Sequence, residues 1–62
     1  KASDATVKAV QRALKSKGYN VGPIDGVMGV KTQTILKKYQ QEFNLPIGNM
    51  NIETLESLGI DY

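Results

Sequence analysis

Several residue types are absent from this 62-residue chain, and each absence narrows what it can be. There is no cysteine, no histidine and no tryptophan. Disulfides and the usual cysteine–histidine zinc sites are therefore excluded as sources of stability. A chain of this length buries only roughly 60% of the surface that its unfolded form exposes, so it has to fold on the packing of one small core.

Long apolar runs are also missing. No apolar run exceeds three residues, so no segment resembles a signal peptide or a membrane span. Hydrophobic residues still make up 40% of the chain, which is enough for a core and too much for a disordered segment. We expect residues 1–3 to be the remnant of a linker and residues 4–62 to form a single domain, cut from a longer parent protein whose export signal lies outside this sequence.

Acidic residues are nearly absent from the first two thirds of the chain. Between Ala5 and Gln41, seven Lys or Arg residues accompany a single acid, Asp25, whereas residues 42–62 carry four acids and no base. The net charge of +2 therefore hides a basic part and an acidic part. This asymmetry is compatible with an ordinary solvated surface and also with a field that favours an anionic partner.

Catalytic groups are equally scarce. With no His or Cys in the chain, its Ser residues have no base placed by a recognisable motif. A glycosidase would need a second carboxyl group opposite Asp25, and the alternating acids of a calcium-binding EF-hand do not follow this residue. We therefore expect no enzyme activity, no metal site and no cofactor.

The most distinctive stretch of the chain is Gly22–Thr32, which reads Gly-Pro-Ile-Asp-Gly-Val-Met-Gly-Val-Lys-Thr. It holds three of the six glycines and one of the two prolines. Glycine permits positive φ angles and proline fixes φ, so this composition specifies one loop path and not a floppy connection. Asp25 lies at the centre of the loop, which makes the loop the best candidate for a binding surface.

Apolar residues recur at spacings of three and four on both sides of this loop, which predicts amphipathic helices. The first helix is expected at about 4–17, with Ser3 or Asp4 as its N-cap and Gly18 as its stop. The second is expected to follow Gly29 as N-cap. Its apolar face should contain Ile35, Leu36, Tyr39 and Phe43, while Lys37, Lys38, Gln40 and Gln41 should point mainly outward.

Asn44 is expected to close the second helix, because the proline two residues later prevents further helix. A short third helix is predicted at 51–58, with Asn51 as N-cap and an apolar face of Ile52, Leu55 and Leu58. The sequence therefore predicts an all-α fold, a compact three-helix domain with a Gly/Pro-rich loop between helices 1 and 2.

The two loops of this arrangement resemble each other. Pro23–Thr32 matches Pro46–Thr54 if Asp25 is treated as an insertion, with Pro, Ile, Gly, Met and Thr recurring in register. This match predicts a pseudo-repeated loop–helix unit, two copies of which share one core. Chance similarity between two short segments is the alternative. Met28 and Met50 hold matching places, where we expect them to fill gaps under the loops.

Four stretches of the chain, spanning about residues 7–60, resemble the three-helix peptidoglycan-binding domain that is appended to many bacterial cell-wall hydrolases. They are Val10–Leu14, Gly18–Tyr19 with Gly22–Gly26, Gly29–Thr32, and Leu45–Pro46 with Thr54–Leu55. Two departures stand out. Family members often have Pro where Val30 stands, and their second loop is longer than the compact segment here.

The resemblance implies a monomeric, non-catalytic module of the cell envelope (periplasm, cell wall or secreted) that binds peptidoglycan, through glycan or stem peptide, and tethers a covalently linked domain of a parent protein. We expect the ligand to meet the first loop and the start of the second helix, through Tyr19, Asp25, Gly26, Lys31 and Thr32. Roles without a ligand are the alternative: hydrogen bonds within the loop for Asp25 and Thr32, partial burial for Tyr19, and an ordinary solvated side chain for Lys31.

Two other function classes are considered. A protein–protein docking or regulatory domain of an envelope protein would use the same fold without touching the wall. A DNA-binding three-helix domain would read bases with its last helix. That helix carries Glu53 and Glu56 and no base, so phosphate repulsion disfavours nucleic acid as a partner.

Overall fold

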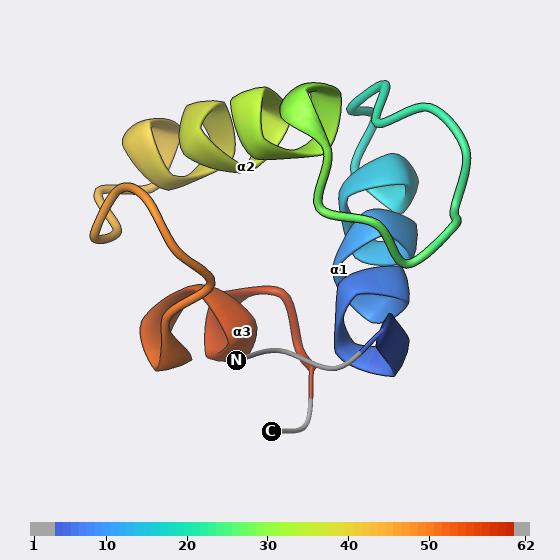
Figure 1. Ribbon diagram of the computed structural model, residues 1–62. Coiled ribbons are helices and arrows are strands. Elements are labelled where there is room, and N and C mark those ends of the chain that lie inside the picture. The colour runs from blue at the N-terminus through green and yellow to red at the C-terminus, as the bar shows by residue number, and fades with distance from the viewer. Residues whose placement is uncertain (1–3, 61–62) are drawn as a thin grey trace.

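A computed structural model of the protein describes residues 4–60 and folds them into three α-helices joined by two loops (Figure 1). The helices are α1 (Asp4–Ser16), α2 (Val30–Glu42) and α3 (Ile52–Ser57). In Figure 1, α2 runs across the top of the molecule, α1 descends at its right and the short α3 lies below. The all-α three-helix prediction is confirmed. The predicted linker remnant, residues 1–3, lies outside the described residues.

α1 forms where the sequence pattern predicts a helix. Its buried side chains are Val7, Val10, Gln11 and Leu14, spaced by three and four residues, and Lys15 in the last turn suits the negative end of the helix dipole. α2 begins after Gly29, as expected, although this N-cap residue has no side chain to offer a hydrogen bond.

All three helices end in the same way. The second residue after the end of each helix takes a positive φ angle: 96° at Gly18, 56° at Asn44 and 75° at Gly59. The next residue donates its backbone N–H to a carbonyl one turn back, with N–O distances of 3.0 Å for Tyr19 to Leu14, 2.8 Å for Leu45 to Gln40 and 2.9 Å for Ile60 to Leu55. This Schellman arrangement satisfies carbonyl groups that a helix end would otherwise leave without partners.

One core joins the three helices, consisting of Val10, Leu14, Val21, Leu36, Tyr39, Leu55 and Leu58. Tyr39 lies at its centre, with its hydroxyl hydrogen-bonded to Ser57. The ring of Tyr39 meets that of Tyr19 edge to face at 5.9 Å and that of Phe43 at 4.5 Å between centroids. The aromatic residues among those described therefore form one column, in which Tyr39 of α2 lies between Tyr19, which follows α1, and Phe43, the C-cap of α2.

Three side chains differ from expectation. Phe43 is 54% exposed because it is the C-cap residue of α2, where only one face of its ring meets Tyr39. Ile52 is 55% exposed because it opens α3, ahead of the turn that reaches the core. Gln40, predicted to point outward, is fully buried because its side-chain amide forms hydrogen bonds with the second loop.

Candidate functional site

The first loop is held against α1 by the side chain of Gln11, which is fully buried. Its Oε1 accepts a hydrogen bond from the Gly26 backbone N–H at 3.0 Å. Its Nε2 donates to three acceptors, the Val27 carbonyl (3.1 Å), Thr32 Oγ1 (3.2 Å) and Asp25 Oδ1 (3.2 Å). Because buried polar groups are costly to leave without partners, this one glutamine fixes the path of the loop.

Gly26 is required where the loop passes α1. Its φ angle is +77°, and a Cβ there would lie 3.2 Å from the Asp4 carbonyl oxygen and 3.3 Å from Lys8 Cε. Both the backbone conformation and the close approach therefore favour glycine. Two lysine side chains flank the loop. Lys8 lies beside Gly26, and Lys31 Cδ lies 3.5 Å from the position that a Cβ on Gly22 would take.

Asp25 is exposed, but one of its oxygens serves the loop. Oδ1 accepts the Val27 backbone N–H at 2.9 Å in addition to the bond from Gln11. These two bonds, the Val27 bond first, lower the pKa of Asp25, and the nearby Lys8 ammonium lowers it further. The carboxylate is therefore ionised at neutral pH and lies at the surface of a rigid loop.

The five sequence-predicted ligand residues fall into three environments. Asp25, Gly26 and Thr32 come together around Gln11, and Thr32 is only 3% exposed, with its hydroxyl accepting from Gln11. Lys31 is exposed beside the same loop, over Gly22. Tyr19 is not part of this group: it lies half-buried against Tyr39, and its hydroxyl donates to Glu42. That bond, aided by desolvation, raises the pKa of Tyr19 to about 12.

The second loop uses the same device. Oε1 of the buried Gln40 accepts the Gly48 N–H at 2.8 Å, and its Nε2 donates to the Asn49 carbonyl at 2.8 Å and to Thr54 Oγ1 at 3.0 Å. Gly48, Asn49 and Thr54 thus repeat the parts played by Gly26, Val27 and Thr32. The alignment of the two loops predicted from the sequence therefore pairs the residues that make equivalent contacts with the two glutamines.

The clamping glutamines are the residues that the sequence interpretation missed. Gln11 shares a helical face with Val7 and Leu14, at spacings of four and three, and Gln40 follows Leu36 by four. A glutamine in phase with the apolar stripe signals a buried polar role, and its recurrence ahead of each similar loop strengthens that signal.

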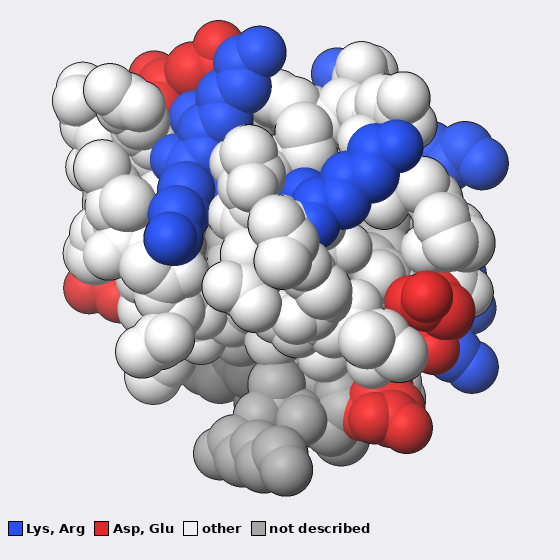
Figure 2. Space-filling view, turned by 45° about the horizontal axis from the view of Figure 1, so that its top comes forward, with Lys and Arg blue, Asp and Glu red and all other residues white. Residues whose placement is uncertain are grey.

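Basic side chains spread over one side of the molecule. Figure 2, which turns the top of Figure 1 toward the viewer, shows Lys and Arg side chains across this face, with acidic groups at its edges. α2 contributes the exposed Lys31, Lys37 and Lys38. The basic character expected for the first part of the chain is therefore present on the surface, next to the first loop.

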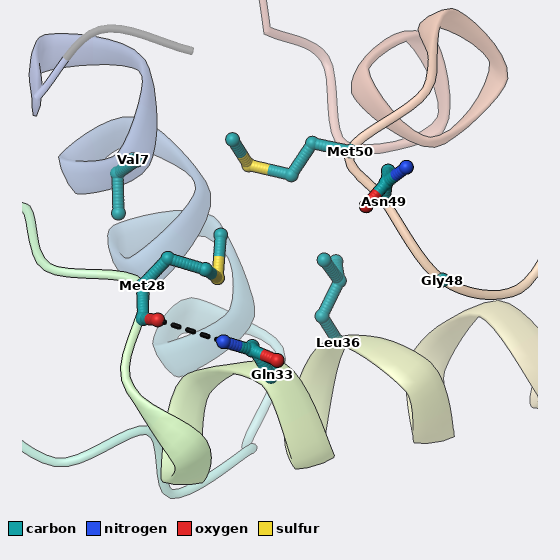
Figure 3. Close-up of a pocket in the computed structure, with 7 residues that line it drawn as sticks. All are labelled: Val7, Met28, Gln33, Leu36, Gly48, Asn49 and Met50. Carbon is teal, nitrogen blue, oxygen red and sulfur yellow. Dashed lines mark hydrogen bonds between the residues drawn. The ribbon is translucent and has the colours of Figure 1, made fainter. Parts of the chain in front are cut away.

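A groove of about 560 Å³ separates the two loops (Figure 3). This inter-loop groove is lined by Val7, Met28, Gln33, Leu36, Gly48, Asn49 and Met50. The side chains of Met28 and Met50, which hold equivalent positions in the two units, extend into the space above Leu36. Gln33 Nε2 donates to the Met28 carbonyl at 2.9 Å and so ties the first loop to α2.

Both methionines pack partly against the core, as a gap-filling role requires, and they also line the inter-loop groove. None of the five predicted ligand residues lines it. Among residues 4–60, no three His, Cys, Asp or Glu side chains are grouped so as to hold a metal ion. No helix in the described part of the chain has the length and apolar character needed to cross a membrane.

Fold and loops together define an all-α domain built from two glutamine-clamped loop–helix units. Residues 3–58 match the family described as "Putative peptidoglycan binding domain". The chain therefore belongs to this family of peptidoglycan-binding domains, and the resemblance drawn from the sequence is confirmed.

Two curated proteins are similar to the chain. Both are named "Localization factor PodJL", from Caulobacter vibrioides strains NA1000 / CB15N and ATCC 19089 / CIP 103742 / CB 15, and each is 35% identical over 60 residues, or 95% of this chain. The chain spans only 6% of the length of these relatives. No solved structure matches the chain significantly.

Proposed function

We propose that this domain binds bacterial peptidoglycan without performing a reaction and, within a longer envelope protein, holds a linked domain at the cell wall. The observation that carries the proposal is that the first loop, which bears the family motif, is both fixed and accessible. Gln11 beneath it is fully buried, while Pro23, Asp25 and Val27 are exposed. A loop already held in its bound shape loses little conformational entropy when a ligand arrives.

Within this proposal the exposed groups meet the ligand and the buried ones keep the loop in shape. The Asp25 carboxylate accepts hydrogen bonds from ligand amide or hydroxyl groups, and the Lys31 ammonium pairs with ligand carboxylates. Gly26 and Thr32 act through the loop, because both are buried against Gln11. Tyr19 contributes at the edge of the site through its half-buried ring.

Weak affinity is sufficient for this role. A domain held on the wall by many low-affinity contacts raises the local concentration of whatever is linked to it. We also propose that the module acts as a monomer within its parent protein.

Retention on insoluble peptidoglycan tests the proposal. The purified domain should pellet with peptidoglycan at low salt, and Asp25→Asn combined with Lys31→Ala should reduce retention about ten-fold, through the loss of two charged contacts of about 0.7 kcal/mol each. Asn at position 25 retains an oxygen that can accept from Val27, so the loop is preserved. Lys38→Ala, an exposed lysine on the same helix, is the matched control and should leave retention unchanged. Absence of retention for the unaltered, folded domain would refute the proposal.

Docking of a protein partner is a second candidate. Phe43, Ile47 and Ile52, all in or beside the second unit, are exposed apolar side chains, and exposed apolar groups can mark protein contacts. The relatives' name, localization factor, is compatible with such a role. This candidate is favoured if the domain ignores peptidoglycan but binds the neighbouring domain of its parent, and if Phe43→Ser weakens that binding.

A further inference from the structure

The inter-loop groove differs in chemistry from the exposed first loop. Its apolar surface comes from Val7, Leu36 and the two methionines, and its polar groups are the amide side chains of Gln33 and Asn49. Among residues 4–60, no charged side chain and no aromatic ring lines it. The three aromatic rings of residues 4–60 lie instead in the column formed by Tyr19, Tyr39 and Phe43.

We propose that the inter-loop groove binds an alanine-bearing segment of the peptidoglycan stem peptide. This inference rests on the proposed function and adds which part of the polymer is recognised and where. An alanine methyl group would lie against Leu36 between Met28 and Met50, whose flexible thioethers adapt readily to a small apolar group. The adjacent peptide group would meet the two carboxamides.

Those carboxamides retain unused hydrogen-bonding capacity. Gln33 bonds to the Met28 carbonyl through Nε2, which leaves its Oε1 to accept from a ligand N–H. Asn49 is bonded to Gln40 and Asn51 through its backbone carbonyl, so its side chain is available as donor and acceptor. One acceptor from α2 and one donor from the second loop, on either side of an apolar floor, match the N–H and C=O of a peptide group.

Two observations favour the stem peptide over the glycan. Saccharide rings are commonly bound on aromatic faces, and no aromatic ring of the described residues lines the inter-loop groove. The stem peptide carries free carboxylates, whereas unmodified glycan rings are neutral. α2, which supplies Gln33 and Leu36 to the groove, also exposes Lys31 and Lys37. This charge complementarity favours the anionic part of the polymer.

The test is a titration of the isotope-labelled domain, followed by amide NMR, with two separate probes: the synthetic peptide N-acetyl-L-Ala-γ-D-Glu-L-Lys-D-Ala, whose acetylated amino terminus leaves it with a net negative charge, and chitotetraose. The peptide should shift the amides of the groove residues, and chitotetraose should leave them in place. Asn49→Ala should weaken peptide binding about five-fold, the effect of one lost hydrogen bond. Asn20→Ala, an exposed asparagine in the first loop that does not line the groove, is the matched control.

Each outcome separates this inference from the proposed function. If the domain pellets with peptidoglycan but the peptide leaves the groove amides unmoved, or chitotetraose moves them instead, the inference is wrong and peptidoglycan binding stands. The inference is also wrong if Asn49→Ala and Asn20→Ala bind the peptide equally. If the domain does not pellet at all, the proposed function itself fails. Because all bonds of Asn49 to the rest of the chain use its backbone, Asn49→Ala is expected to fold normally.

Discussion

The two loop–helix units use the same buried glutamine in different surroundings. In the second unit, the two hydrogens of Gln40 Nε2 serve two acceptors. In the first unit, Gln11 Nε2 serves three, because Asp25 is inserted there and adds its carboxylate. The second unit caps its helix with Asn51, whose side chain accepts from Thr54, whereas Gly29 at the equivalent position of the first unit forms no such bond.

This comparison distinguishes the residues that the fold requires from those that are available for binding a ligand. The glutamine, the glycine and the threonine occur in both units, and their hydrogen bonds account for them. The residues that do not recur include Asp25, which has no counterpart, and Lys31, whose place is taken by Glu53. Asp25 and Lys31 are therefore the residues whose presence is least explained by the needs of the fold.

The largest expected effect comes from removing either clamp. Gln11→Ala and Gln40→Ala should each lower the free energy of unfolding by about 3–4 kcal/mol, because each leaves several buried polar groups without partners. For a domain of this size, whose total stability is about 3–9 kcal/mol, that loss is severe. Urea unfolding followed by circular dichroism measures it. A loss below about 1 kcal/mol in either variant would show that water replaces the glutamine at little cost.

The two clamped glycines should differ in their tolerance of a methyl group. Gly26→Ala should cost about 2–4 kcal/mol, because it adds strain at positive φ and a close contact with the Asp4 carbonyl oxygen. Gly48→Ala should cost about 1–2 kcal/mol, since the backbone is strained but no atom lies within 4 Å of the added Cβ. Thermal unfolding of the two variants, measured side by side, compares them. Equal costs would mean that the contact with α1 is unimportant.

The helix caps provide a smaller test. Asn51→Ala should lower the free energy of unfolding by about 1 kcal/mol, through loss of the bond to the Thr54 N–H. Installing the same cap in the first unit by Gly29→Asn should raise it by a few tenths of a kcal/mol, because the backbone there is already extended and the site is open. Destabilisation by Gly29→Asn would show that the two helix starts are not interchangeable.

Acid should weaken the first loop before the second. The folded pKa of Asp25 lies below its ordinary value, so its stabilising effect is present above the unfolded pKa and is lost as pH falls through the folded one. Below about pH 4, amide exchange should therefore accelerate at Val27, whose N–H is bonded to Asp25, relative to Gly48, whose N–H is bonded to Gln40, after correction for intrinsic rates. Asp25→Asn should abolish this difference. Persistence of the acid effect in that variant would assign it to another carboxyl group.

Alkali should destabilise the domain at Tyr19, just ahead of the first loop. The Tyr19 pKa is raised to about 12 by its bond to Glu42, so this bond stabilises the fold fully below the unfolded pKa of about 10 and is lost as pH rises through the folded one. Between these two values, the unaltered domain should lose stability that Tyr19→Phe does not lose. Parallel curves for the two proteins would exclude the bond as the cause.

Much of the fold could be predicted from local rules. The apolar period located all three helices, and Gly18, Asn44 and Gly59 marked their ends, because helix phase and positive φ are encoded over a few residues. The exposure of Phe43 could not be read in this way, since it depends on where the chain leaves the helix.

The candidate site was harder to predict. The loop and its Asp25 were evident from composition, but the roles of Gln11 and Gln40 depend on bonds to residues 8 to 21 positions away. The inter-loop groove combines residues from α1, both loops and α2, and no single stretch of sequence displays it.

Hydrogen exchange at two amides tests most directly the claim that each loop is fixed by one buried glutamine. In the free domain, the N–H groups of Gly26 and Gly48 should exchange only through global unfolding, because both donate to the clamps. Under conditions where Gln11→Ala remains folded, Gly26 alone should become fast while Gly48 stays slow. Rapid exchange of both amides in the unaltered, stably folded domain would contradict the account.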